Sequence, residues 1–259
     1  DKLLTDLLFF SYDEDLKNAK KIQINYANNS HYKSQLLNKY SALRYADVDN
    51  VICYNINDID EDFKNKNKEI LECKKGAGYW LWKPYLILKT LKDLNDDEYL
   101  IYCDSSVIHL KSWFPVIELM YKLKTDIGCF EIIQLEKMWT KRDLFINMDL
   151  DDKDYTDTYQ RCASYQIIKK NDFTLKFYKE YLELCCRKEN ITDSPSKRNK
   201  NYDCFKEHRH DQSIFSLLTK KYNIPCLRDP CQFRFEGDGG ISKAEGSYGQ
   251  LLNHHRSKY

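Results

Sequence analysis

Short apolar runs alternate with helical patterns along this chain, and that alternation restricts its possible folds more than any other feature. Strands are predicted at residues 3–12, 50–56, 99–104, 127–133 and 162–170, and helices at residues 30–46, 79–94, 112–124, 173–186 and 211–222. Strands and helices in alternation predict an α/β fold with a mostly parallel sheet that is flanked by helices on both faces. Ligands of such sheets bind beyond the carboxyl ends of the strands, so the residues that follow each strand are candidate site residues.

Two of the helical patterns depend on particular residues. Leu36, Leu37, Tyr40 and Leu43 recur at the spacing of one face of an amphipathic helix. Pro84 stands where the first turn of a helix tolerates proline, because an N–H at that position would have no partner within the helix. Residues 187–203 are polar and charged instead, which predicts a mobile loop.

The composition argues against two classes of partner. The 41 lysines and arginines nearly cancel the 40 aspartates and glutamates, so no overall field steers the chain towards nucleic acid or an anionic membrane. The chain is 259 residues long and 42% apolar, which is enough for the core of one large domain. No stretch approaches the roughly 20 apolar residues that a membrane-spanning helix requires.

Cysteine usage bears on the compartment. Ten cysteines in a chain of this length predict buried, reduced thiols and not disulfides, because a large core needs no covalent staples. Reduced thiols favour a cytoplasmic location. The chain begins at Asp1, so an upstream leader or anchor stays open, as does the oligomeric state.

The strand YLIYC ends in Asp104, Ser105 and Ser106. A carboxylate at a strand end is well placed to hold a hard divalent cation, which prefers oxygen ligands and can bridge the phosphates of a nucleotide. The alternative is a turn that ends the strand through side-chain hydrogen bonds and has no further function.

The segment GAGYWLWKP, residues 76–84, combines features of a ligand site. Its two glycines allow a close approach of the backbone, and Lys83 lies at a helix start, whose amides favour an anion. Trp80 and Trp82 offer stacking surfaces, but at this spacing the two rings do not both face a ligand.

The segment HRHDQS, residues 208–213, precedes an apolar helix. Asp211 suits the N-cap of that helix, which is the simplest role for it. Cys204, His208 and His210 would also fit part of a zinc site, but no second pair of ligands at a familiar spacing completes it. The tail LLNHHRSKY carries His254 and His255, which are either solvated or fold back to bind a metal or cover a nucleotide.

Taken together, these motifs resemble nucleotide-sugar-dependent glycosyltransferases of the GT-A fold. The likeness is greatest to small transferases of bacterial polysaccharide loci and of large DNA viruses of algae and protists. The segments that carry it are GAGYWLWKPYLI, MWTKRDLF, HRHDQSIFSLL and NHHR. The resemblance implies a single Rossmann-like catalytic domain with a nucleotide-binding half (1–110) and an acceptor half (111–259), the latter including the loop at about 187–203 and the C-terminal tail.

The resemblance also implies an activity, the transfer of a hexose or pentose from a nucleotide donor, UDP-sugar first among the candidates, to a hydroxyl of an oligosaccharide or glycan acceptor. It implies catalysis by Asp211 and Gln212, donor binding by Ser11, Tyr12, Tyr79, Trp80, Lys83, Asp104 and Ser105, and acceptor binding by Trp139, Thr140, Lys141 and His210.

The metal site implied by the resemblance departs from the family pattern. Ser106 stands where the second acid of the Asp-x-Asp motif is usual, which leaves Mn²⁺ or Mg²⁺ one carboxylate short beside Asp104. Either the Ser106 hydroxyl contributes, or His254 or His255 completes the site, as a C-terminal histidine does in enzymes of the glycogenin type. A reaction without a metal stays open.

Two other functions compete with sugar transfer. A metal-dependent phosphohydrolase would use the His-Asp pair in HRHD, but such enzymes are all-helical, unlike this alternating pattern. A non-catalytic carbohydrate-binding module would use the aromatic residues, but it would not need Asp104 and Lys83 at ends of elements that face a ligand.

Overall fold

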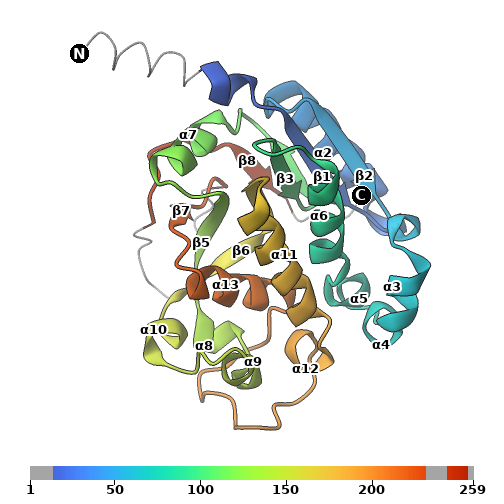
Figure 1. Cartoon of the computed structure of the whole chain (residues 1–259). Helices are drawn as coiled ribbons and strands as arrows, with labels where there is room; N and C mark the ends of the chain where they lie inside the picture. Colours follow the sequence, from blue (N-terminus) through green and yellow to red (C-terminus); the bar gives the residue numbers. More distant parts are fainter. Residues whose placement is uncertain (1–13, 232–243, 256–259) are drawn as a thin grey trace.

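The computed structural model of the chain describes residues 14–231 and 244–255. A six-stranded sheet with the order β2-β1-β3-β6-β5-β7 forms its centre (Figure 1). The strands are β1 (Lys21–Tyr26), β2 (Asn50–Tyr54), β3 (Tyr99–Cys103), β5 (Ile127–Leu135), β6 (Tyr159–Lys169) and β7 (Cys226–Arg228). Two short strands, β4 (Val107–His109) and β8 (Leu252–His254), pair with each other in a separate antiparallel ribbon.

The strand directions confirm the expected α/β fold with a mostly parallel sheet. The pairs β1–β2, β1–β3 and β5–β7 are parallel, and β6 runs antiparallel to both of its neighbours, β3 and β5. One sheet thus includes strands from both expected halves of the chain. Because β1 and β3 are parallel neighbours, the residues that follow Tyr26 and Cys103 emerge at the same edge of the sheet.

Helices follow most strands. They are α2 (Tyr32–Tyr45), α3 (Glu61–Lys66), α4 (Lys68–Leu71), α5 (Gly76–Tyr79), α6 (Trp82–Asp93), α7 (Phe114–Lys122), α8 (Glu136–Trp139), α9 (Arg142–Asn147), α10 (Lys153–Thr156), α11 (Asp172–Cys185), α12 (Lys188–Ile191) and α13 (Asp211–Lys221), with single 3-10 turns at Asn29–His31 and Ile56–Asp58. The five helices expected from the sequence are therefore present as α2, α6, α7, α11 and α13.

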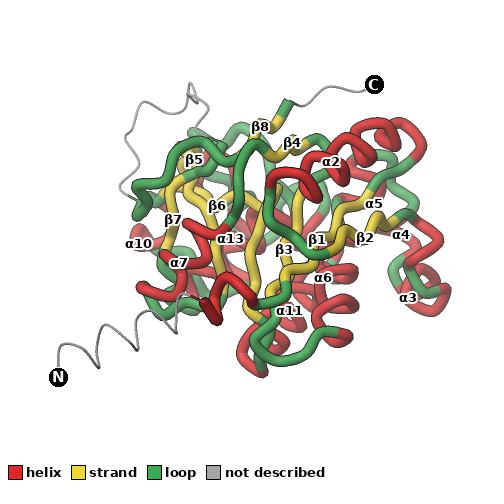
Figure 2. The backbone as a smooth tube through the Cα atoms, turned by 90° about the horizontal axis from the view of Figure 1, so that it is seen from above, coloured by secondary structure: helices red, strands yellow, loops and turns green. Residues whose placement is uncertain are grey.

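The helices form a layer on each face of the sheet. Buried residues of α6, α11 and α13, such as Leu88, Phe177 and Phe215, share one core cluster with the sheet. Ala42 of α2 and Met120 of α7 belong to the cluster on the opposite face. In Figure 2, α2 lies on one side of strands β1 to β3, and α6 and α11 lie on the other. The sheet is thus buried between two helical layers.

Three expectations about the chain need comment. The strand expected at 3–12 lies outside the described residues, and β1 at Lys21–Tyr26 is the first strand within them. Residues 187–203, expected as a mobile loop, contain α12 and bury Asn190, Ile191 and Thr192. The helix expected at 30–46 is present as α2, but its apolar Leu36, Leu37, Tyr40 and Leu43 are exposed while Ser34, Gln35, Asn38 and Ser41 are buried.

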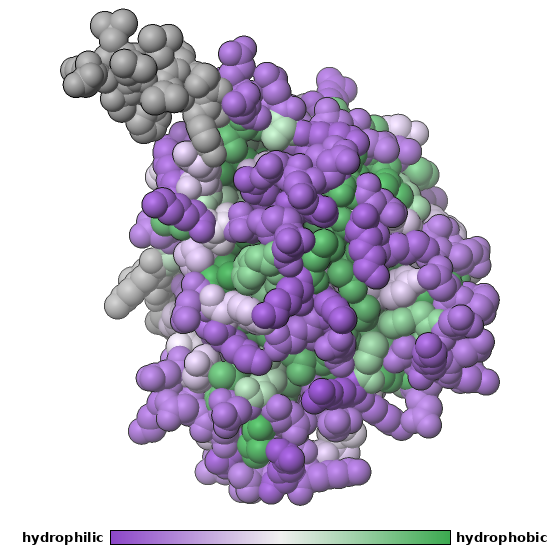
Figure 3. Space-filling view, in the orientation of Figure 1, coloured by the Kyte–Doolittle hydropathy of each residue, from purple (hydrophilic) through white to green (hydrophobic). Residues whose placement is uncertain are grey.

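The surface of the protein is mixed in character. In Figure 3 hydrophilic residues dominate the outline of the visible face, and hydrophobic residues show between them near its middle. Among the described residues, no helix has both the length and the apolar sequence needed to cross a bilayer. All ten cysteines lie within the described residues and are free thiols.

Candidate active site

A left-handed turn of the backbone precedes the lysine of the GAGYWLWKP segment. Five consecutive residues, Gly76 to Trp80, have positive φ angles, which cost energy for each residue with a side chain. Gly78 is required here, because a Cβ would lie 2.7 Å from the Cα of Leu71. The turn ends at Trp80, and α6 follows directly with Lys83 in its first turn. Strained backbone of this kind persists at sites where it positions functional groups.

The two tryptophans of this segment occupy different places. Trp82 is buried and stacks on Tyr26 of β1, with 3.9 Å between the ring centroids, and its Nε1 donates to the carbonyl of Gly76. Trp80 is half-buried and stacks on the His210 ring at 5.4 Å. Trp82 therefore secures the turn against the sheet, while Trp80 is held between α6 and the start of α13.

Asp104 follows β3, whose five residues are all buried. Its backbone N–H donates to the carbonyl of Ser164 on β6, and its side chain accepts a hydrogen bond from the Tyr102 hydroxyl. The Asp104 side chain retains 22% exposure. The end of β3 thus fixes a carboxylate that is anchored from one side and accessible from the other.

Asp211 is not the N-cap of its helix, which corrects the simplest role expected for it. His210 occupies the N-cap with a φ of 54°, and Asp211 is the first residue of α13. The Asp211 carboxylate accepts from the Tyr181 hydroxyl at 3.3 Å and pairs with Lys83, so it caps nothing and instead belongs to a charge cluster.

Lys83 lies between two carboxylates. Its Nζ is 2.7 Å from Oδ2 of Asp211 and 3.7 Å from Oδ1 of Asp104, and both Lys83 and Asp211 are only 3% exposed. Burial lowers the pKa of Lys83, but the two carboxylates outweigh it and raise the pKa overall. Burial raises the pKa of Asp211 to about 6, against the opposing effect of Lys83. The cluster therefore holds one ammonium and two carboxylates, one of which ionises only near pH 6.

The C-terminal strand brings a histidine to the same place. Val107 of β4 pairs with His254 of β8, which places His254 beside the Asp-Ser-Ser segment. The Nε2 of His254 lies 2.9 Å from the Ser106 hydroxyl oxygen, and the backbone N–H of His255 donates to the carbonyl of Ser106. The tail thus folds back over the end of β3, which is one of the two alternatives that the sequence left open.

Two cavities meet at Asp104 and Trp80. The larger cavity, about 860 Å³, is also lined by Lys83, Asp211, Gln212, Lys75, Arg209, His210, His254 and His255, among others. The smaller cavity, about 440 Å³, lies over the ends of β1 and β3 and is lined by Tyr26, Asn28, His31, Gly76, Trp82, Ser105 and Ser106, among others. Most of the expected donor and metal residues thus come together at the junction of two cavities.

The histidines of the HRHD segment are held as neutral side chains. The His208 Nε2 lies 2.7 Å from the carbonyl of Asn190, and the His210 Nδ1 lies 2.8 Å from the carbonyl of Ile191. Burial lowers the pKa of His210 to about 4 and that of His208 well below its ordinary value. Cys204 is exposed, so the partial zinc site is not assembled.

Several expected residues lie away from the cavities. Thr140 is buried and donates to Glu136, and the Nζ of buried Lys141 donates to the carbonyl of Thr192 at 2.8 Å. Trp139 packs behind the larger cavity, with the Arg209 guanidinium over its ring at 4.3 Å. Tyr79 packs against the His210 ring at 4.9 Å. Ser11 and Tyr12 lie outside the described residues.

Sequence reasoning missed residues that the fold brings to the site. Tyr26 is the last residue of β1 and Asn28 lies just after it, and both line the smaller cavity. In β1 the apolar Ile22, Ile24 and Tyr26 alternate with polar residues, a pattern that predicts a strand. Tyr102 and Tyr181 hold the two carboxylates from within buried elements, where no local pattern distinguishes them from core residues.

A divalent cation beside Asp104 would have the Asp104 carboxylate, the Ser106 hydroxyl and the His254 imidazole as candidate ligands. Adjacent ligand atoms of an octahedral ion lie about 3 Å apart when each is about 2.1 Å from the metal. The 2.9 Å between Ser106 Oγ and His254 Nε2 matches that spacing. Within the described part of the chain, no three His, Cys, Asp or Glu side chains gather in one group, so the set depends on the Ser106 hydroxyl.

No protein-family model and no curated protein matches the chain. Among solved structures, it is similar to mouse xyloside xylosyltransferase 1 in its apo form, with 11% identity, 92% of this chain and 97% of that chain covered, and a TM-score of 0.49. It is also similar to apo glycosyltransferase GlyE of Streptococcus pneumoniae, with 14% identity, 93% and 55% covered, and a TM-score of 0.43. The chain thus spans about half of GlyE.

A third similar structure is the galactosyltransferase LgtC in complex with donor and acceptor sugar analogs, with 16% identity, 74% and 68% of the two chains covered, and a TM-score of 0.35. With TM-scores below 0.5, these likenesses by themselves assign no activity, which has to come from the site residues. All three similar structures are glycosyltransferases, the class that the motifs of this chain resemble.

Proposed function

We propose that the protein is a metal-assisted glycosyltransferase that moves a sugar from a nucleotide donor to a hydroxyl of a glycan acceptor. The observation that carries this proposal is the buried Lys83 ammonium between Asp104 and Asp211 in the larger cavity, which meets the smaller one at Asp104. The smaller cavity, over the ends of β1 and β3, would take the nucleotide, and the larger one the sugar and acceptor. The bond that breaks would then lie at the junction.

Lys83 suits the leaving group of such a reaction. Breaking the bond between the sugar and the diphosphate develops negative charge on the phosphate oxygens, which an ammonium stabilises more in the transition state than in the ground state. Because Asp104 and Asp211 keep Lys83 protonated in spite of its burial, the positive charge is in place before the donor binds. These charged groups therefore need little reorganisation when the transition state forms.

Asp211 suits the acceptor side. It lines the larger cavity, and its pKa of about 6 leaves it ionised at neutral pH but basic enough to receive a proton. In an inverting displacement it would accept the proton of the incoming hydroxyl, and in a retaining one it would orient the sugar. Gln212 lines the same cavity and is positioned by a 2.9 Å hydrogen bond from its Nε2 to Gln160, so we assign it to donor-sugar contact.

Asp104, Ser106 and His254 would hold the divalent cation, with Mn²⁺ or Mg²⁺ as candidates, and His255 lies next to them. When bound, the cation would neutralise charge on the diphosphate. Ser105 lines the nucleotide cavity and Trp80 reaches both cavities, so both are proposed as donor contacts. His210 lines the larger cavity and is proposed as an acceptor contact.

The nucleotide carrier is proposed to be UDP, on the resemblance of the motifs, and either a hexose or a pentose is compatible with the site. The ten free thiols favour a reducing compartment such as the cytoplasm. A phosphohydrolase is disfavoured, because His208 and His210 bond to backbone carbonyls and Asp211 pairs with Lys83, so the HRHD side chains do not converge on a metal.

A thermal-shift panel of UDP-, GDP- and dTDP-sugars, with and without Mn²⁺, tests the proposal. We expect UDP-sugars with Mn²⁺ to raise the Tm by several degrees, because a ligand that binds only the native state stabilises it. Asp104→Asn should lose most of that shift. Asp203→Asn is the matched control, since the Asp203 side chain is 93% exposed. Stabilisation by a free glycan but by no nucleotide sugar would favour a binding module and overturn the proposal.

A further inference from the structure

The helix α2 has its polarity reversed with respect to the core. Its buried side chains include Ser34, Gln35, Asn38 and Ser41, and Ala42 is its only buried apolar residue. Its exposed side chains include Tyr32, Leu36, Leu37, Tyr40, Leu43 and Tyr45, with exposed fractions between 38% and 65%. These six are two thirds of the nine large apolar side chains exposed among the described residues. An exposed apolar cluster of this kind marks an interaction site.

Hydrogen bonds fix the rotation of α2 about its axis. Asn38 accepts from Gln23 and Asn25 of β1, at 2.9 and 2.6 Å, and its Nδ2 donates to the carbonyl of Val107 at 2.8 Å. Gln35 donates to the carbonyl of Tyr54 at 2.9 Å. Turning the apolar face inward would leave these buried polar groups without partners, so the fold itself holds that face outward.

The outward face is continuous. At 100° per residue, Tyr32, Leu36, Tyr40 and Leu43 fall within an arc of about 80°. These side chains project from the convex surface of a helix, a shape that suits insertion into the apolar layer of a membrane. Leucine supplies apolar area, and tyrosine has an apolar ring with a polar tip that suits a membrane interface.

The charges of α2 have a single sign. Lys33, Lys39 and Arg44 are its only ionisable residues besides the tyrosines, and it contains no Asp or Glu. Lys39 borders the apolar arc on one side, and Lys33 and Arg44 border it on the other. Two copies of α2 packed face to face would bring these cations together, which disfavours a second copy of the chain as the occupant. The face is complementary to an apolar layer with an anionic surface.

We propose that α2 docks on a lipid bilayer that exposes anionic headgroups, with Leu36, Tyr40 and Leu43 entering the interface and the three cations contacting the headgroups. The near-zero net charge does not oppose this, because the cations act locally within a Debye length. Ser30 and His31, immediately before α2, line the smaller cavity, so docking would bring its rim close to the membrane. The proposal goes beyond the proposed activity and does not depend on it.

Vesicle co-sedimentation of the purified chain tests this proposal. We expect at least tenfold tighter binding to vesicles with about 30 mol % phosphatidylserine than to pure phosphatidylcholine, and weaker binding as salt rises. The triple variant Leu36→Gln/Tyr40→Gln/Leu43→Gln should lose roughly tenfold or more in affinity. These side chains are exposed, so the Tm of the variant should stay near that of the wild type.

Two controls separate this docking from other contacts. Tyr121→Gln removes an exposed aromatic ring of α7, and Lys66→Gln/Lys68→Gln/Lys92→Gln removes three exposed cations elsewhere, and both variants should sediment like the wild type. Lys33→Gln/Lys39→Gln/Arg44→Gln should instead abolish the preference for phosphatidylserine. The proposal is overturned if the wild type ignores anionic vesicles, if the α2 variants bind unchanged, or if α2 proves to be the interface of a dimer in solution.

Discussion

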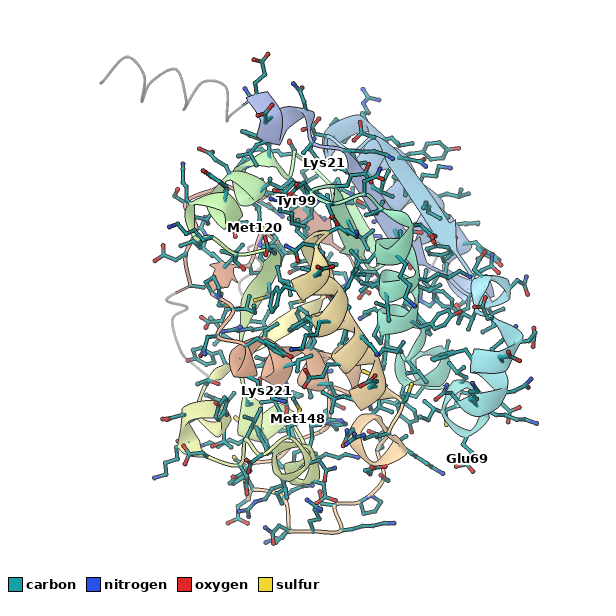
Figure 4. The ribbon with its side chains drawn as sticks, viewed as in Figure 1. Lys21, Glu69, Tyr99, Met120, Met148 and Lys221 are labelled. Atoms are coloured by element: carbon teal, nitrogen blue, oxygen red, sulfur yellow. The ribbon has the colours of Figure 1, made fainter. Side chains whose placement is uncertain are left out.

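The two ends of α13 hold buried ion pairs of the same chemistry in different surroundings. At its start, Asp211 lies 2.7 Å from Lys83, and near its end Lys220 lies 2.6 Å from Glu136. Lys221, labelled in Figure 4 at this second end, makes a separate pair with Glu180 of α11 at 2.8 Å. The difference between the two buried pairs lies in their partners.

The Glu136 carboxylate is fully buried and saturated with donors. One oxygen accepts from Ser216 and Lys220, and the other accepts from Thr140 at 2.7 Å and Gln160 at 3.2 Å. Burial lowers the pKa of Lys220 in spite of Glu136, whereas two carboxylates raise the pKa of Lys83 in spite of its burial. The pair of Lys220 with Glu136, in which every carboxylate oxygen has donors, serves stability. The cluster of Lys83 with two carboxylates faces a cavity and is available to take part in a reaction.

Asp211→Asn should produce the largest effect. If Asp211 acts on the acceptor or sugar, kcat should fall roughly 10³-fold, because positioned acids and bases contribute about 10² to 10⁴. The Tm at neutral pH should rise, since the raised pKa of Asp211 means that its ionised form is disfavoured in the folded state. Steady-state kinetics and calorimetry on the same preparation measure both, and a loss of Tm together with a normal kcat would reverse the assignment.

Glu136→Gln is the counterpart at the other end of α13. It leaves the buried Lys220 ammonium without its carboxylate, and breaking one side of a buried pair costs about 3 to 5 kcal/mol. Urea unfolding should show that loss, while kcat per folded molecule stays within about twofold of the wild type. A large fall in kcat of the folded protein would place Glu136 in the site as well.

The pH dependence should distinguish the two ends. Asp211 is ionised above its pKa of about 6, so kcat/KM should rise as pH increases through that value and level off above it. Stability should change in the opposite direction, falling as pH rises from about 4 to about 6, because the folded state then binds more protons than the unfolded one. The pH profiles of Asp211→Asn should lack both changes. If kcat/KM of this variant still rises with pH through about 6, Asp211 is not the group that titrates.

Ser106→Asp should have a smaller and favourable effect on metal binding. It supplies a second carboxylate next to His254, and a harder, more negative ligand set binds Mn²⁺ more tightly, by roughly tenfold. Titration of Mn²⁺ against turnover, or calorimetry with Mn²⁺ alone, measures the change. Ser30→Asp, outside the proposed ligand set, is the control. An equal gain in both variants would show a charge effect without coordination.

The sequence indicated the parts of this arrangement that are local in origin. The buried run of β3 and the Asp104 that follows it, the proline-initiated α6 with Lys83, and the start of α13 at Asp211 all agree with the structure. Each depends on neighbours within a few residues, such as Pro84 in the first turn of α6, so a local pattern was enough to find it.

The parts that the sequence did not indicate depend on distant partners. The spacing of Leu36, Tyr40 and Leu43 predicts a helix but not which face is buried, because Asn38 is held inward by Gln23 and Asn25 on another element. The partners of Asp211 were not foreseen for the same reason, since Lys83 and Tyr181 reach it from α6 and α11. The backbone N–H of Lys141 donates to His208 of the segment HRHDQS, but its Nζ donates to the carbonyl of Thr192, and the Thr140 hydroxyl donates to Glu136.

The most direct test of the proposed glycosyl transfer follows both products of one reaction. Wild-type protein with Mn²⁺, a UDP-sugar panel and a glycan acceptor mixture should release UDP and glycosylated acceptor in equal amounts, and Asp211→Asn should release neither at a comparable rate. Inorganic phosphate without glycosylated acceptor, or no turnover of any nucleotide sugar by folded wild-type protein, would contradict the assignment of Lys83, Asp104 and Asp211 to sugar transfer.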